Sequence, residues 1–497
     1  MQQFLSELKT GENQRESLRG LIDALKAHPG DSKQCLAALS RDEWCGLLAS
    51  EDAKTRKNTA QLLSMLPWET EDASAVCEAL YNTYRSEETL FVREAYIKAM
   101  SAFDAKPYEE GLRQRFDQLS SWDFSAEDQK HIRKERAQLG QLLSALSESG
   151  GHTRKDLPRG KMWLFRSEPW LLNLIAEEYP QGRRLPFGLL VEGKQPAKLV
   201  ENRLYEQLLI QVPQAKEHPV CESDFCDGFR NSGLMKLLSE LYVEEKAFSF
   251  RLDIYGKYEQ DARIALMKRA SAALEDATGG YLYNAPADYE IELVLFPRRD
   301  GTFGVFLWPG DLGAERFAYR KHTSAVSMAP QKAAAAALIC KPFLQKGVFR
   351  VDAFCGEGTW LVECDRIAPA RETFGCDIFG DAIRGGRENA EAAGVDIHFI
   401  QRDFFDFTNR QSFAELLGEL PDLFHKEPGE KNAFFRGFFQ NALAITREDS
   451  VWMVITAEEN LLKKNLRLHE NLKLQLQAPF GKTKALYIIR RQDEGLE

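Results

Sequence analysis

The segment 348–363 combines three local patterns that few folds accommodate together. A β-branched, apolar run ends in the acidic Asp352, a turn of small residues follows, and a helical pattern begins near Thr359. Gly356 and Gly358 have no Cβ, so the backbone can turn sharply there and a ligand can lie against it. The segment predicts the first strand, loop and helix of a doubly wound α/β domain. A tight strand-to-helix turn without any ligand would show the same pattern.

Two further strands are predicted after this segment, and each also ends in an acidic residue. The strand at 374–377 ends in Asp377, the helix 381–393 follows, and the strand at 397–403 ends in Asp403. Three carboxylates at one sheet edge would repel a pyrophosphate. They suit a ligand with hydroxyls, amines and a positive centre, such as S-adenosylmethionine. Each acid would also serve as a helix N-cap, a position that Asp favours.

The motif at 352–359, Asp-Ala-Phe-Cys-Gly-Glu-Gly-Thr, resembles the D-P-x-C-G-x-G-T signature of the THUMP-associated RNA methyltransferases. The resemblance extends upstream to 319–322 and 328–334, and downstream to 375–378 and 387–390. It implies a Rossmann-like class I methyltransferase domain that depends on S-adenosylmethionine. The family's usual activity is methylation of a guanine amino group in tRNA or rRNA.

The resemblance also implies where the cofactor would bind. The carboxylate and glycines of the 352–358 segment would surround the methionine part, Asp377 would accept hydrogen bonds from both ribose hydroxyls, and Asp403 with Phe404 would meet the adenine. No metal is expected. The expected cofactor-binding residues are Asp352, Phe354, Cys355, Gly356, Gly358, Thr359, Asp377, Ile378, Asp403 and Phe404.

The residues expected on the target side depart from the family pattern. Amino methyltransferases carry N-P-P-Y or a variant after the fourth strand, where Asn aims the amine and the aromatic ring stacks on the base. No Asn-Pro-Pro occurs here. The best alignment uses 413–422 and gives Glu419 in place of Asn, followed by Pro421, with Phe424 or His425 as the ring. Glu419, Pro421 and Phe424 are therefore the expected catalytic residues.

Glu419 has two interpretations. A carboxylate can accept a hydrogen bond from an amine, but Glu is one methylene longer than Asp or Asn, and an ångström of misplacement can cost about a hundredfold in rate. Alternatively, the site has lost its chemistry. The apolar residues of 413–420 also follow helical spacing, so this segment fits a helix as well as the fourth strand. Beyond it, a helix is expected at 432–445, a strand at 450–456, and an antiparallel strand pair at the C-terminal end.

Residues 1–150 predict an all-helical domain, because charged and apolar residues interleave at helical spacing. The segments that start at Arg56 and Arg93 look alike and are 37 residues apart, which is close to a HEAT-like helical repeat. Such a stack would leave a concave surface for a protein partner. An ordinary helical bundle with a chance likeness is the alternative.

The middle of the chain, 160–315, predicts an α+β domain after a polar linker at 147–160. A strand at 247–254, a helix at 262–274 and strands ending near 295 and 308 resemble the core of an RNA-binding THUMP module. The run Lys155, Arg159, Lys161 and Arg166 accompanies Trp163 and Phe165, as in an RNA-contacting patch, or forms a plain solvated face. Further candidate phosphate contacts are Arg251, Lys268, Arg269, Arg298 and Arg299.

Bulk properties limit the function classes. The 497 residues suit several domains, here the helical 1–150, the THUMP-like 160–315 and the methyltransferase 322–497. Nine cysteines without a C-x-x-C pair, together with the absence of a signal peptide or a membrane-spanning run, indicate a cytoplasmic protein. The net charge of −10 counts against strong nonspecific RNA binding. The expected function is methylation of a base amine, guanine N2, in tRNA or rRNA. The alternatives are a lapsed, binding-only methyltransferase and one that acts on protein or a small molecule.

Overall fold

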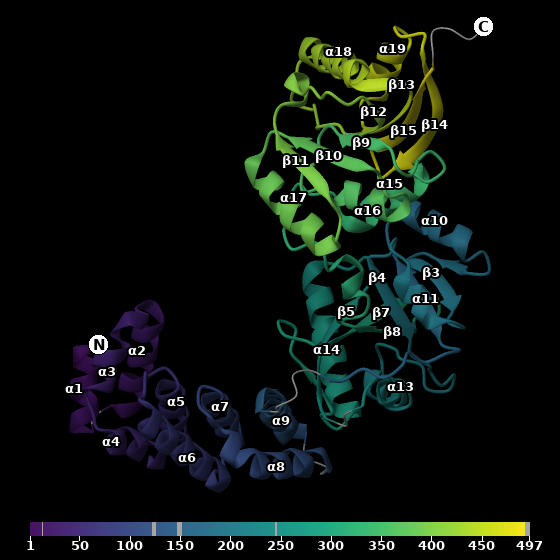
Figure 1. Cartoon of the computed structure of the whole chain (residues 1–497). Coiled ribbons are helices and arrows are strands. Elements are labelled where there is room, and N and C mark those ends of the chain that lie inside the picture. Colours follow the sequence, from purple (N-terminus) through teal and green to yellow (C-terminus); the bar gives the residue numbers. More distant parts are fainter. Residues whose placement is uncertain (12, 122–125, 147–151, 244–245, 493–497) are drawn as a thin grey trace. The chain divides into compact units, whose positions relative to one another are not determined.

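The computed structural model describes residues 1–11, 13–121, 126–146, 152–243 and 246–492 (Figure 1). The chain forms two compact units, one of Met1–Pro158 with Ile210–Gly310 and one of Arg159–Leu209 with Asp311–Glu497. Among the described residues, no helix combines the length and the apolar character needed to cross a membrane.

The N-terminal part of the first unit is built of helices, as predicted, in all of its described residues up to 146 (Figure 1). Of the predicted linker, residues 147–151 lie outside the described residues. The helices are α1 (Gln2–Thr10), α2 (Gln14–Ala27), α3 (Ser32–Leu36), α4 (Arg41–Gly46), α5 (Ala53–Leu63), α6 (Thr70–Ser86), α7 (Leu90–Met100), α8 (Glu109–Ser121) and α9 (Ala126–Leu146), with the 3-10 turns η1 (Pro29–Asp31), η2 (Leu47–Ala49) and η3 (Lys106–Tyr108).

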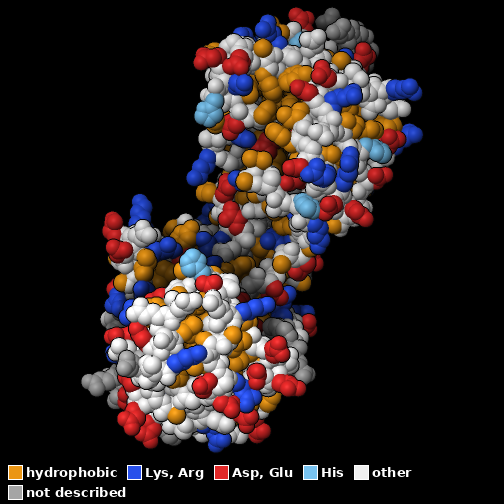
Figure 2. Space-filling model, turned by 90° about the vertical axis from the view of Figure 1, so that its left-hand side faces the viewer, with side chains coloured by type: hydrophobic (Ala, Val, Ile, Leu, Met, Phe, Trp, Pro, Cys, Tyr) orange, Lys and Arg blue, Asp and Glu red, His pale blue; other side chains and the backbone are white. Residues whose placement is uncertain are grey.

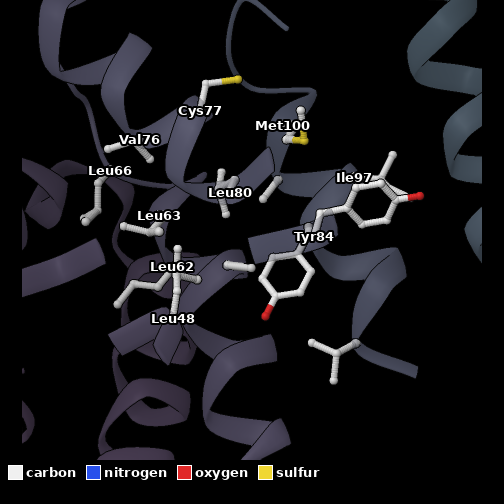
Figure 3. Packing of buried hydrophobic residues seen from close by; sticks show 14 of the residues in the cluster. Leu48, Leu62, Leu63, Leu66, Val76, Cys77, Leu80, Tyr84, Ile97 and Met100 are labelled. Atoms are coloured by element: carbon white, nitrogen blue, oxygen red, sulfur yellow. The ribbon is translucent and has the colours of Figure 1, made fainter. Parts of the chain in front are cut away.

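One hydrophobic core runs through these helices. Figure 3 shows Leu62 and Leu63 of α5 beside Leu80 of α6, with Met100 of α7 nearby, and all four are fully buried. Helices of this length are only marginally stable alone, so the burial of these apolar faces supplies most of their stability.

The two similar segments found in the sequence occupy equivalent places in α5 and α7. Arg56, near the start of α5, donates to both carboxylate oxygens of Glu87 at 2.8 Å. Arg93, near the start of α7, donates to Glu135 of α9 at 3.2 Å. Burial works to raise the pKa of Glu87, but hydrogen bonds, the one from Arg56 foremost, lower it to about 2. Each arginine therefore joins its helix to a buried carboxylate further along the chain.

The rest of the first unit is an α/β region whose order agrees with the prediction. The parallel neighbours β5 (Phe248–Ile254) and β7 (Ile291–Pro297) are connected through α14 (Gln260–Ala277), and β7 pairs antiparallel with β8 (Phe303–Pro309). The remaining elements are β6 (Leu282–Asn284), which pairs with β5, and the helices α12 (Phe225–Arg230) and α13 (Leu234–Leu241). β8 also pairs with the end of β4 (Gln207–Gln211).

The second unit starts with an antiparallel ladder in which β3 (Gly188–Glu192) lies between β2 (Arg183–Leu185) and β1 (Met162–Arg166). The helices α10 (Pro169–Glu178) and α11 (Pro196–Glu201) accompany it. Trp163 and Phe165 of β1 are fully buried. The hypothesis that these rings stack on RNA bases beside the basic run is therefore wrong, because a core ring presents no free face.

The C-terminal domain is a seven-stranded sheet of order β11-β10-β9-β12-β13-β15-β14, in which the first five strands are parallel and the last two pair antiparallel (Figure 1). The expected helices and strands of this domain are all present. The strands are β9 (Phe349–Asp352), β10 (Glu372–Asp377), β11 (Ile397–Gln401), β12 (Phe413–Glu419), β13 (Thr446–Thr456), β14 (Leu472–Phe480) and β15 (Lys484–Arg491). The helices are α15 (Pro330–Cys340), α16 (Thr359–Ile367), α17 (Gly380–Ala393), α18 (Pro428–Ile445) and α19 (Glu459–Leu466).

Within the ambiguous segment 413–420, residues Phe413–Glu419 form the strand β12 and not a helix. It lies between β9 and β13 with both of its faces buried, one against the core of α15, α16 and α17 and one against that of α18 and α19. A strand buried on both faces is apolar at successive positions, so its sequence also satisfies helical spacing. The core position of the phenylalanines in α18 is confirmed, since Phe435, Phe438 and Phe439 are fully buried.

A buried ion pair joins the two central strands. Arg350 of β9 donates from Nε to Oε2 of Glu415 in β12 at 2.6 Å, and neither side chain is exposed. Glu415 and Arg350 lie directly opposite each other in the register of β12 and β9. A buried charge is stable only beside its partner, so this pair favours a single register of β9 against β12.

Candidate active site

Carboxylates gather at the edge where the parallel strands end. Asp352 ends β9, Asp377 ends β10 and Glu419 ends β12, while Asp403 follows β11. The buried thiol of Cys376 lies among Asp377, Asp352 and Asp403; burial raises its pKa to about 12, and the three carboxylates act in the same direction. The three acids singled out in the sequence are thus close together.

The turn between β9 and α16 needs its glycines. Gly356 and Gly358 have φ of 51° and 74°, in the left-handed region where a Cβ is strained. A Cβ on Gly358 would lie 2.6 Å from the ring of Phe399, whereas a Cβ on Gly356 would meet nothing within 4 Å. The backbone at Gly356 therefore borders open space. Cys355, by contrast, points inward and is buried, and its N–H donates to the Cys376 carbonyl at 3.0 Å.

Asp377 organises this turn from the neighbouring strand. Its Oδ2 accepts from the Gly356 N–H at 2.8 Å and its Oδ1 from the Phe379 N–H at 3.0 Å. The helix α17 begins after Phe379 and has no side-chain cap, so Asp377 is not its N-cap. Asp403 does act as a cap, because it accepts from the Phe405 N–H at the start of the 3-10 turn η5 (Phe404–Asp406). Thr359 opens α16 and is buried.

Asp352 is the most perturbed acid of the group. It is 2% exposed, and its Oδ1 accepts from the Phe354 N–H at 3.0 Å. Burial raises the pKa of Asp352 to about 7; the carboxylates of Asp377 and Glu419 add to this rise, and the hydrogen bond from Phe354 opposes it. A positive charge next to Asp352 would reverse the rise, so this edge is complementary to a cationic ligand.

Aromatic side chains line the edge in two groups. Phe404 is 1% exposed, with its ring 5.6 Å from that of Phe354 and 5.7 Å from that of Phe438, so it belongs to the core. The exposed apolar side chains near the strand ends are Phe405, two residues after Asp403, and Ile378 and Phe379, which directly follow Asp377; they are 38%, 54% and 66% exposed. Phe379 and Phe405 were not among the predicted site residues. The sequence marks them only by their position shortly after Asp377 and Asp403. Figure 2 shows hydrophobic side chains gathered on one face of the C-terminal domain.

The target-side residues are placed as follows. Glu419 is half-buried, and its Oε1 accepts from Nζ of Lys484 at 2.8 Å. Pro421 is exposed, and Phe424 is 65% exposed with no ring contact among the described residues. Lys484 starts β15, two strands away from β12, and no local motif marks it. Sequence reasoning therefore found Glu419 without its partner.

Residues 318–485 match the family model described as "RMKL-like, methyltransferase domain". This part of the chain is an S-adenosylmethionine-dependent methyltransferase domain. A search of curated proteins gives no match to its sequence.

Two solved structures share the methyltransferase fold with part of this chain. TrmN from Thermus thermophilus has 18% identity and a TM-score of 0.51, covering 66% of this chain and 99% of its own. SMU.472, a putative methyltransferase complexed with SAH, has 13% identity and a TM-score of 0.51, covering 69% of this chain and 100% of its own. At these identities the likeness concerns the fold.

The residues at the sheet edge fit S-adenosylmethionine. The open space beside Gly356 leaves room for a ligand against the backbone, and the acids around Asp352 suit a sulfonium charge. When bound, the cofactor supplies a methyl group on a positively charged sulfur. We expect Asp352 to face that charge, Asp377 to bind hydroxyls with the lone pairs that its two backbone hydrogen bonds leave free, and Ile378 and Phe405 to cover a planar group.

Proposed function

We propose that this methyltransferase modifies a base amine of structured RNA, with guanine N2 in tRNA or rRNA as the target. The resemblance of the 352–359 motif to the THUMP-associated RNA methyltransferases supports this substrate. So does the region around α14, where the strand–helix–strand order of β5, α14 and β7 is that expected of a THUMP-like module.

The basic residues of that region divide into two groups. Arg251 pairs with the buried Glu292, and Arg269 pairs with Glu222. Arg298 donates to Gln214 at 2.9 Å. Lys268 and Arg299 are exposed and form no ion pair among the described residues. We therefore assign phosphate contacts first to Lys268 and Arg299, because a phosphate there displaces no internal carboxylate.

The observation that carries the proposal for the amine is the geometry of Glu419. Lys484 occupies Oε1, and among the described residues no hydrogen bond reaches Oε2. Oε2 can accept a hydrogen bond from an amine N–H, which turns the nitrogen lone pair away from the carboxylate. After the nitrogen has gained a methyl group it carries an extra proton, and Glu419 can take that proton. Lys484 holds the longer Glu side chain in one orientation, which compensates for its additional methylene.

The test is a transfer assay with the purified full chain, methyl-labelled S-adenosylmethionine, and total tRNA and rRNA. We expect labelled RNA, and nucleoside mass spectrometry that identifies N2-methylguanosine. Asp377→Ala should give no label, while Asp381→Ala, an exposed acid of α17 paired with Arg384, should behave as the unmodified chain. Tight cofactor binding without label on any cellular RNA would contradict the proposal.

One observation favours a second function, a binding protein that has lost methyl transfer. The carboxylate of Glu419 is already engaged by Lys484, and a purely structural ion pair would look the same. This function predicts that calorimetry detects cofactor binding, that no RNA is labelled, and that Glu419→Ala changes neither result.

A further inference from the structure

A cavity of about 530 Å³ opens among the N-terminal helices, far in sequence from the methyltransferase domain. Its walls come from α6, α7, η3 and α8. Pockets of roughly 300–1,000 Å³ are the size that binds small ligands. The walls carry three arginines and three tyrosines, so a polar ligand suits them better than an apolar one.

The back of the cavity holds more positive than negative charge. Glu135 of α9 is fully buried and accepts from Arg93 at 3.2 Å and from Arg115 at 2.9 Å. Tyr84 donates its hydroxyl to the same carboxylate at 2.8 Å. Two guanidinium groups therefore share one carboxylate. Both of them line the cavity and keep 13% and 21% of their side chains exposed, so the surplus positive charge faces the open space.

A third guanidinium group lies at the rim. Arg85 of α6 is exposed, lines the cavity, and has its Cζ 5.9 Å from the ring centre of Tyr81. It forms no ion pair among the described residues. The lining contains one carboxylate, Glu110, which accepts from Gln114 at 3.4 Å. The cavity thus retains positive charge although the whole chain has a net charge of −10.

Aromatic rings form another part of the wall. Tyr81 and Tyr108 stack with ring centroids 4.5 Å apart. The Tyr81 hydroxyl lies against Gly111 of α8, where a Cβ would be 1.9 Å from its oxygen. Only a glycine admits the ring in this position. Stacked tyrosines beside arginines are the combination that binds a planar base and its phosphate.

We propose that this cavity binds a nucleotide unit, with its phosphate against Arg85, Arg93 and Arg115 and its base against the Tyr81–Tyr108 pair. Planar guanidinium groups match phosphate oxygens in a bidentate manner, and stacked rings add a planar surface that an acidic peptide would leave unused. The same nucleotide chemistry occurs in a free mononucleotide and in single-stranded RNA. The RNA source rests on the proposed function; the site itself does not.

Binding is tested with the full chain in the absence of S-adenosylmethionine. The result therefore does not depend on whether the C-terminal domain transfers methyl groups. The probes are guanosine 5′-monophosphate and a fluorescent single-stranded oligoribonucleotide, followed by calorimetry and anisotropy. Arg85→Glu should weaken binding at least about tenfold and lower its salt dependence. The control is Arg113→Glu, an equal charge change on an exposed residue of α8 that pairs with Glu109 outside the cavity lining, and it should change affinity less than about twofold.

Tyr108→Ala is a second variant that leaves all charges in place. It should weaken the nucleotide several-fold and leave competition by inorganic phosphate unchanged. Binding of the mononucleotide alone supports a free nucleotide, and binding of the oligoribonucleotide alone supports RNA. The proposal is overturned if neither probe binds, if Arg85→Glu and Arg113→Glu weaken binding equally, or if inorganic phosphate competes as well as the nucleotide does.

Discussion

The carboxyl edge of the C-terminal sheet and the cavity of the N-terminal helices are both polar, but they concentrate opposite charges. At the sheet edge, Asp352 and Asp377 receive hydrogen bonds from backbone N–H groups, and burial raises the pKa of Asp352, with the neighbouring carboxylates adding to the rise. In the cavity, Arg93 and Arg115 share the single carboxylate of Glu135. The sheet edge is electrostatically complementary to a cation, and the cavity is complementary to an anion.

The two sites also differ in what holds them. Strand ends and a glycine turn fix the acids, so their position follows from the sheet. Side chains from separate helices fix the arginines, so the cavity depends on one buried counter-charge. The net charge of −10 does not predict the basic cavity, because local fields act over about 8–10 Å at physiological salt. Each of the following substitutions changes one of these two sites.

The largest effect is expected for Asp377→Ala at the acidic edge. The substitution removes the acceptor for two backbone N–H groups and the ligand for the ribose, so cofactor affinity should fall at least about a hundredfold and methyl transfer should be lost. Isothermal titration calorimetry measures the first and labelled RNA the second. Asp381→Ala is the matched control. Cofactor affinity unchanged in Asp377→Ala would refute this placement of the site.

A large effect on stability is expected for Glu135→Gln in the basic region. The amide keeps the shape of the side chain but leaves Arg93 and Arg115 without a counter-charge, which should cost about 3 kcal/mol of local stability. Hydrogen exchange of the amides of α7 measures this loss. The control Glu109→Gln changes a partly exposed carboxylate of α8 and should cost less than about 1 kcal/mol. Equal protection in both variants would show that the arginines need no buried carboxylate.

A smaller effect is expected for Lys484→Met, which frees Oε1 of Glu419. The turnover number should fall about tenfold while cofactor affinity stays the same, because the carboxylate loses its orientation and not its charge. Lys484→Arg should restore most of the activity, and Lys484→Met should add nothing in a Glu419→Gln background. Lys482→Met, an exposed lysine on the same turn, is the control. Additive losses in the double variant would place Lys484 in a structural role.

The smallest effect is expected in the pH dependence that Asp352 causes. The fold raises the pKa of Asp352 from 3.8 to about 7, so the unfolded chain releases this proton at a lower pH than the folded chain does. The contribution of Asp352 to the free energy of unfolding therefore falls as the pH rises from about 4 to about 7 and is constant above about 7. The ionised carboxylate attracts the sulfonium, so cofactor affinity should rise with pH up to about 7, by less than about tenfold per unit. Titration calorimetry from pH 6 to 8 should show this rise, and Asp352→Asn should abolish it. A flat profile in the unmodified chain would contradict the coupling.

The acids and glycines of the candidate site were predictable because they belong to local patterns. A strand that ends in Asp352, a turn that requires positive φ at Gly356 and Gly358, and acids after the next two strands are visible in short windows. The distinction between Phe404 and Phe405 was not, since both rings contact α18 and only their packing in the fold makes Phe404 buried and Phe405 partly exposed. The nature of 413–420 was also hidden, because a strand buried on both faces has no alternation.

The sequence by itself determined the strand–turn–helix at 348–363, the helical N-terminal region and the residue types at the strand ends, because backbone preference and periodicity act between near neighbours. Tertiary structure alone decided that Lys484 meets Glu419 across 65 residues, and that Arg93 meets Glu135 across 42. These pairs depend on strand order and helix packing, in which side chains far apart in the chain are brought within hydrogen-bonding distance. Charge at each site is therefore a property of the fold, although each charged residue is written in the sequence.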